Sequence, residues 1–133
     1  MSNPAVMVAV RAHMAAITGL PSIVWPNEEI RVQPPFLIWD DGPTVGRPIT
    51  IDGEERFEFR PQVSLMVQPG SFTATGDAIL RDIAQAFKWN TKITSGGAFV
   101  AYCLQTPTAD NGRPDGGYFR RDMTLRIASD QQI

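Results

Sequence analysis

The most regular pattern in the chain is an alternation of apolar and polar residues between positions 56 and 68. Odd positions carry the apolar residues Phe57, Phe59, Val63, Leu65 and Val67, and even positions carry Arg56, Glu58, Arg60, Gln62, Ser64 and Gln68. A period of two predicts a β-strand with one face in the core and the other in water. Pro61 lies inside this strand and favours an edge position or a β-bulge there, because proline cannot donate to a strand ladder.

A helix is predicted directly after this strand. Pro69 and Gly70 end the strand, and the hydroxyl groups of Ser71, Thr73 and Thr75 are candidate helix caps. Apolar residues then recur at helical spacing, at Ile79, Leu80, Ile83, Ala84 and Phe87. This stripe is typical of an amphipathic helix that lies on a sheet, and the four-residue spacing of Asp77 and Arg81 favours an ion pair on its outer side.

The remaining segments follow the same two periodicities. Residues 4–18 are predicted to form a first helix, and residues 36–39, 99–104 and 118–128 are predicted strands. Residues 23–25 are predicted to form a short strand or an extended link. Arg121 falls on the apolar side of the last strand, which indicates a strand end or a local bulge. Residues 42–55 read as a long connector or β-arm, residues 105–117 as a polar loop, and residues 129–133 as a polar tail.

This order of elements predicts a single α+β domain over residues 1–133. Short connections favour antiparallel pairing, so the expected fold is a mostly antiparallel sheet with two helices packed on one face. With 133 residues, a net charge of −2 and a pI near 5.3, the chain does not have the basic character of a protein that wraps nucleic acid. No apolar run approaches the roughly 20 residues that a membrane span requires.

The sequence contains no motif that indicates catalysis, a cofactor or a metal. His13, the one histidine, is expected to be partly buried, and adjacent Asp40 and Asp41 fit ordinary turn chemistry. Cys103 is expected to be a small buried residue, and Trp25, Trp39 and Trp89 are expected in the core, where an exposed one would suggest an interface. These readings predict a protein that is not an enzyme and holds no cofactor.

Several segments in their order resemble the tail terminator family of long-tailed phages, the minor tail protein U type, which also occurs in prophages and gene transfer agents. The segments that carry the resemblance are residues 23–27, 57–67, 67–73, 83–87 and 114–120, and together they span most of the chain.

The resemblance implies a structural virion protein. Such a protein forms a homohexameric ring that caps the tail tube, ends its polymerisation and joins the tail to the head. The implied partners are further copies of the chain, the tail tube protein and the head–tail connector protein, while DNA passes through the ring without specific binding. The implied location is the tail–head junction of the virion, after assembly in the cytoplasm of the bacterial host, with no membrane contact.

Heterologous contacts between identical subunits build such rings, and exposed arginines on the long strands and loops are candidates for them. The candidate subunit or tube contacts are Arg56, Arg60, Arg113, Arg120 and Arg121. Three alternatives stay open: a head-closure or neck protein, a small α+β ligand-binding module, and a hydrolase that uses Asp40, Asp41 or Cys103.

Overall fold

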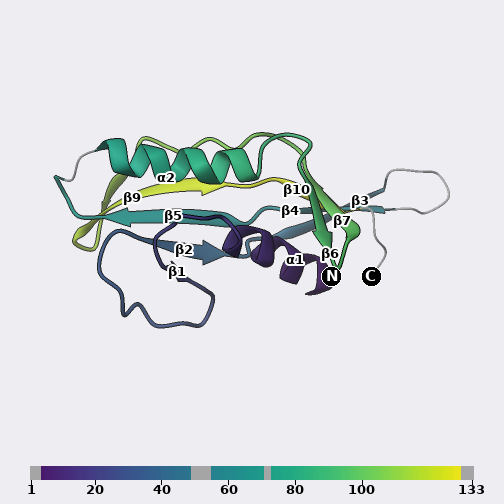
Figure 1. Ribbon diagram of the computed structural model, residues 1–133, viewed down its shortest axis with the longest axis horizontal. Coiled ribbons are helices and arrows are strands. Elements are labelled where there is room, and N and C mark those ends of the chain that lie inside the picture. The colour runs from purple at the N-terminus through teal and green to yellow at the C-terminus, as the bar shows by residue number, and fades with distance from the viewer. Residues whose placement is uncertain (1–3, 49–54, 71–72, 130–133) are drawn as a thin grey trace.

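A computed structural model describes residues 4–48, 55–70 and 73–129 of the chain (Figure 1). The two helices are α1 (Pro4–Ala15) and α2 (Thr73–Ala86). Strands in the first half are β1 (Ile23–Val24), β2 (Phe36–Asp40), β3 (Thr44–Pro48), β4 (Glu55–Phe59) and β5 (Gln62–Val67). Strands after α2 are β6 (Lys92–Ser95), β7 (Ala98–Cys103), β8 (Arg113–Asp115), β9 (Tyr118–Thr124) and β10 (Ile127–Ser129).

The strands form two five-stranded sheets, with the orders β1-β2-β5-β9-β8 and β3-β4-β10-β7-β6. Every pairing is antiparallel except the one between β1 and β2, which is parallel. The predicted α+β class with a mostly antiparallel sheet is therefore confirmed. The strands divide into two sheets, whereas the sequence predicted one.

The two sheets are continuous, because three long segments run through both of them. β2 continues into β3, β4 into β5 and β9 into β10, and each pair is separated by only two or three residues. Hydrogen bonds persist across the break, since the Leu125 amide donates to the Pro61 carbonyl over 2.8 Å and the Arg60 amide donates to the Pro43 carbonyl over 3.2 Å. Pro61 lies at this bend, between β4 and β5, and both of these strands have a neighbour on each side, so the predicted edge position was wrong.

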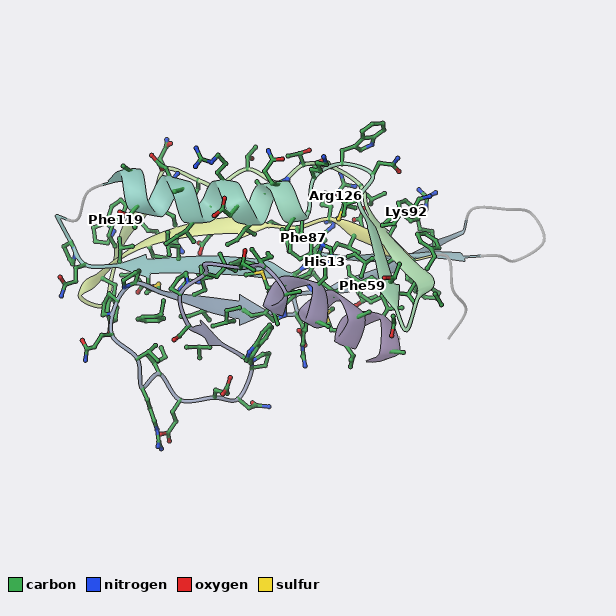
Figure 2. All side chains as sticks on the ribbon, viewed as in Figure 1. His13, Phe59, Phe87, Lys92, Phe119 and Arg126 are labelled. Carbon is green, nitrogen blue, oxygen red and sulfur yellow. The ribbon has the colours of Figure 1, made fainter. Side chains whose placement is uncertain are left out.

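Both helices cover the same face of this bent sheet. The main core joins Val10 and Met14 of α1 and Ile83 of α2 to strand residues at odd positions, among them Phe59 and Val63. Figure 2 shows His13, Phe59 and Phe87 gathered where the helices meet the sheet. The predicted packing of both helices on one face is thus confirmed. Val24, Phe36 and Met66 form a second, smaller core with neighbours on the opposite face.

The connector at residues 42–55 forms a β-arm as far as the structure describes it. β3 pairs with β4 from Thr44↔Phe59 to Pro48↔Glu55, and this ribbon extends to one side of the body (Figure 1). Gly42 allows the chain to enter the ribbon, because its φ is +65° and an added Cβ would lie 2.0 Å from the Arg60 carbonyl oxygen. Within this connector the sequence predicts a short strand fragment at residues 49–51 and a hairpin turn at residues 52–53, and both lie outside the described residues.

Several predicted boundaries were wrong. The first helix ends at Ala15, before residue 18, and the polar loop at residues 105–117 contains strand β8. Ser129 belongs to β10 and is buried, because its hydroxyl donates to the Val100 carbonyl over 2.8 Å. The rest of the predicted tail lies outside the described residues. β6 was not predicted, since Ile93 is its only apolar residue.

Of the predicted caps of α2, Ser71 lies outside the described residues, and Thr73 and Thr75 belong to the helix itself. The apolar stripe of this helix is confirmed, with Ile79, Leu80, Ile83 and Phe87 buried. Asp77 forms its ion pair with Arg121 rather than with Arg81.

Candidate assembly surface

We call the face of the bent sheet opposite the helices the open face. Its polar residues are Arg56, Glu58, Arg60, Ser64, Arg113, Arg120, Asp122 and Arg126. Four of the five candidate contact arginines lie on it, because Arg56, Arg60 and Arg120 have the parity of the polar strand positions and Arg113 pairs in register with Arg120. The structure thus brings these four to one surface. It turns Arg121 to the other side.

Asp122 is the centre of the polar network on the β5–β9–β8 part of the open face. One carboxylate oxygen accepts hydrogen bonds from the Ser64 hydroxyl over 2.6 Å and from Arg120 Nε over 2.9 Å. Its other oxygen lies 2.8 Å from an Arg113 guanidinium nitrogen. Arg120 also pairs with Asp115 over 3.0 Å, so two arginines and two aspartates hold β8 and β9 together.

This network keeps Asp122 charged. Burial alone would raise the pKa of Asp122, but hydrogen bonds from Ser64, Arg120 and Arg113 outweigh burial and lower the pKa to about 2. The same contacts raise the pKa of Arg120, chiefly through its hydrogen bond to Asp122. The side chain of Asp122 is only 14% exposed, so water screens these charges less than at the surface.

Glu58 is the centre of a second network, at the bend between the two sheets. It is 3% exposed, and Arg126 and Arg60 bind its two oxygens over 2.6 Å and 2.5 Å. Burial would raise the pKa of Glu58, but the hydrogen bonds from Arg126 and Arg60 lower it below its ordinary value. Because Arg60 and Arg126 follow β4 and precede β10, this network connects the strands that cross the bend.

Arg56 lies further along β4, towards the end of the ribbon. Its guanidinium carbon is 5.8 Å from the centre of the Tyr102 ring, and this ring stacks on Phe99 at 6.1 Å. Phe99 is 48% exposed, so a cation and two aromatic rings share this part of the surface.

Arg121 has a different role from the other four candidates. It points to the helix side, where it forms an ion pair with Asp77 of α2 and donates to the Asp110 carbonyl over 3.1 Å. The pairing of β5 with β9 is regular from Gln62↔Thr124 to Val67↔Phe119, so the predicted bulge or strand end at Arg121 was wrong. Its position on the apolar side is explained by the carboxylate that α2 presents there.

The sequence predicts that Glu58 and Asp122 share the outer strand faces with the arginines, but not that these two acids are the centres of the networks. Asp122 and Glu58 alternate with arginines along their own strands, which identifies a shared polar face but not the cross-strand register. The sequence places Arg126 on the outer face of the last strand, but it does not predict the ion pair with Glu58, because the bend that turns Arg126 towards Glu58 is a feature of the tertiary structure. The cross-strand neighbours Ser64↔Asp122 and Glu58↔Ala128 depend on that register.

The other candidate groups have structural partners. Asp41 forms an ion pair with Arg11 and accepts from Trp39 Nε1 over 2.8 Å. Burial would raise the pKa of Asp41, but these two partners lower it. Asp40 accepts from the Gly42 amide over 2.8 Å, which confirms its turn chemistry.

His13 and Cys103 were both expected to be at least partly buried, and both predictions are confirmed. His13 Nε2 lies 2.7 Å from the Ala86 carbonyl oxygen, so the ring donates there, and it packs edge-on against Phe87. Cys103 is 1% exposed, and burial raises the pKa of its thiol to about 11. Within residues 4–48, 55–70 and 73–129, no three His, Cys, Asp or Glu residues lie together as a metal site would require.

One tryptophan differs from the prediction that all three lie in the core. Trp39 is buried and Trp25 is partly buried against it, with ring centres 5.8 Å apart. Trp89 is 68% exposed, because it lies beyond the end of α2, where its own amide donates to the Thr106 hydroxyl over 2.9 Å.

Comparisons with known proteins support the fold. No protein-family model and no curated protein sequence matches the chain. Solved structures of 11 protein chains are similar to it. One of them, whose name states no function, matches with a TM-score of 0.63 at 14% identity over 95% of this chain and 96% of its own. At this identity the similarity shows a shared fold and nothing of function. In the described part of the chain, no helix is both long and apolar enough to cross a membrane.

Proposed function

We propose that the chain is a structural virion assembly protein that caps the tail tube as a ring, ends tail polymerisation and joins the tail to the head. The observation that carries this proposal is the β3–β4 ribbon, which extends from the body at one end of a continuous, internally braced sheet (Figure 1). A projecting ribbon reaches a neighbouring subunit without deforming the domain that bears it. Such a contact joins two different surfaces, which is the geometry that closes rings of identical subunits.

The two ion-pair networks support this proposal by making the domain stiff. Asp122 binds arginines of β8 and β9, and Glu58 binds the arginines at the bend, so the open face presents a fixed shape to a partner. A preorganised surface loses little conformational freedom on binding, which favours repeated assembly of identical copies. The proposed partners are other copies of the chain, the tail tube protein and the head–tail connector protein, and the proposed location is the tail–head junction.

The proposal predicts a specific defect when the chain is removed. A phage or prophage that lacks it should make tubes of uncontrolled length and heads without tails, and both defects should be visible by electron microscopy. Supplying the chain from a plasmid should restore tubes of uniform length. Tubes of normal length in its absence would overturn the termination role, and binding to capsid portals in preference to tubes would identify a neck protein.

Arg56 on the ribbon tests whether the ribbon also contacts the tail tube. Arg56→Glu should weaken capture of the chain by purified tail tubes, because it reverses the charge beside the exposed Phe99 ring. Arg81→Glu is the matched control, since Arg81 is exposed on α2, away from the ribbon. Equal capture of both variants and the wild type would exclude Arg56 from the interface.

A further inference from the structure

Trp89 and its neighbours form an exposed aromatic and basic corner of the molecule. The corner consists of Lys88, Trp89 and Lys92, and it contains both lysines of the chain. Lys92 is the first residue of β6, and its side chain is exposed (Figure 2). Neither lysine has an ion-pair partner among residues 4–48, 55–70 and 73–129. The corner therefore combines a large apolar surface with uncompensated positive charge.

The corner is rigid and hollowed. The Asn90 amide donates to the Cys103 carbonyl over 2.9 Å and the Thr91 amide donates to the Lys88 carbonyl over 3.0 Å, so the turn that bears Trp89 is fixed to β7. Beside the indole lies an open depression of about 450 Å³, lined by Lys88, Trp89, Asn90, Thr91 and Thr106. Rigid exposed tryptophans beside hollows are typical of the residues that dominate binding energy at interfaces.

The segment between β1 and β2 carries a surface of complementary character. This acidic loop consists of Glu28, Glu29 and Ile30, and Ile30 is 51% exposed. The side chain of Glu29 is 75% exposed and pairs with Arg31, which follows the loop, so the two acids of the loop and this arginine together carry a net charge of −1. The loop is ordered at its start, because the Trp25 amide donates to the Glu28 carboxylate over 2.8 Å.

The two surfaces lie at opposite edges of the bent sheet. β1 is the edge strand beside β2, whereas β6 is the edge strand beside β7, beyond β10. In Figure 1 the segment between β1 and β2 lies at the lower left, and β6 lies towards the right. The corner and the acidic loop of one chain therefore cannot meet each other, but those of two neighbouring chains can.

We propose that the corner of one copy binds the acidic loop of the next copy, head to tail. Ile30 fills the depression beside the Trp89 indole, and Lys88 and Lys92 pair with Glu28 and Glu29. Two different surfaces meet in this contact, so each copy keeps one free corner and one free loop until a ring closes. The inference deepens the proposed function by naming the two surfaces, and it rests on that function for the expectation that copies associate.

Mixing two variants tests the contact. Trp89→Ala removes the corner but keeps the loop, and Ile30→Lys places a positive charge against the lysines but keeps the corner. Each variant alone should self-associate at least about tenfold more weakly than the wild type by sedimentation equilibrium. An equimolar mixture should form heterodimers and nothing larger, because only one intact corner and one intact loop remain per pair.

Val8→Lys is the matched control, since Val8 is 62% exposed on α1, outside both surfaces. It should leave self-association unchanged, and circular dichroism should show that all three variants are folded. A wild type that stays monomeric at every concentration reached, or variants that fail to form heterodimers when mixed, would overturn the inference. Tube capture is a separate measurement, so self-association without capture would overturn the proposed function alone.

Discussion

Asp122→Asn should destabilise the fold because Asp122 is the acid that holds β8 and β9 to β5. Its pKa lies at about 2 in the folded chain, against an ordinary value of 3.8. This difference corresponds to about 2 kcal/mol of stability that the ionised carboxylate contributes at neutral pH. Asparagine resembles the protonated acid, so the variant should lose about 2 kcal/mol at pH 7, or roughly 6–10 °C in Tm.

The pH dependence of this loss follows from the direction of the pKa change. Because the folded pKa lies below the unfolded one, the contribution is complete well above 3.8 and disappears as the pH falls through about 2. At pH 3 about half of it should remain. The difference in unfolding free energy between wild type and variant, measured by urea denaturation from pH 7 to pH 3, should therefore shrink by about half.

Asp115→Asn provides the matched control for this experiment. Asp115 pairs with the same Arg120 over 3.0 Å, but its side chain is 44% exposed. Such a surface pair is worth less than about 1 kcal/mol, so this variant should lose much less stability. Equal losses for the two variants, or a loss for Asp122→Asn that does not change with pH, would refute the role of the network.

Three further predictions concern the bend, the second network and the core. Gly42→Ala should lower the unfolding free energy, measured by thermal unfolding, by at least about 2 kcal/mol, because the added Cβ would collide with the backbone of Arg60. Gly19→Ala should lower it by about 1 kcal/mol, because the Cβ there would have open space around it. Glu58→Gln should lower the unfolding free energy, measured by urea denaturation, by about 2–4 kcal/mol. Glu29 is exposed, so Glu29→Gln should lower it by less than about 0.5 kcal/mol. Similar losses for the two variants would contradict the role of Glu58 at the bend. Cys103 should react with a thiol reagent only after unfolding, and rapid labelling of the native chain would show that its burial is wrong.

The sequence was sufficient to predict the elements whose periodicity is long and regular. The apolar stripe of α2 and the alternation through β4 and β5 each describe one side of an element in contact with the core, and both were found as predicted. Pro61 marked an irregularity in the strand, because a missing donor has a local consequence. These signals are contained within one element and do not depend on its neighbours.

The remaining features depend on contacts between distant segments. The division into two sheets arises where three strands bend together, and the register that places Ser64 beside Asp122 follows from that arrangement. Arg121 was interpreted as an irregularity because the sequence does not show that Asp77 of α2 lies beside it. Trp89 was assigned to the core because residue type favours burial, whereas its exposure is set by where α2 ends.

The most direct test of the central claim is the molar mass of the chain by light scattering after size exclusion, with and without tail tubes of the phage or prophage that encodes it. A tail terminator should be either a ring of several chains in solution or a smaller species that elutes with the tubes when they are added. A monomer that does not bind the tubes at any ratio of chain to tube would contradict the claim that the chain is a tail terminator.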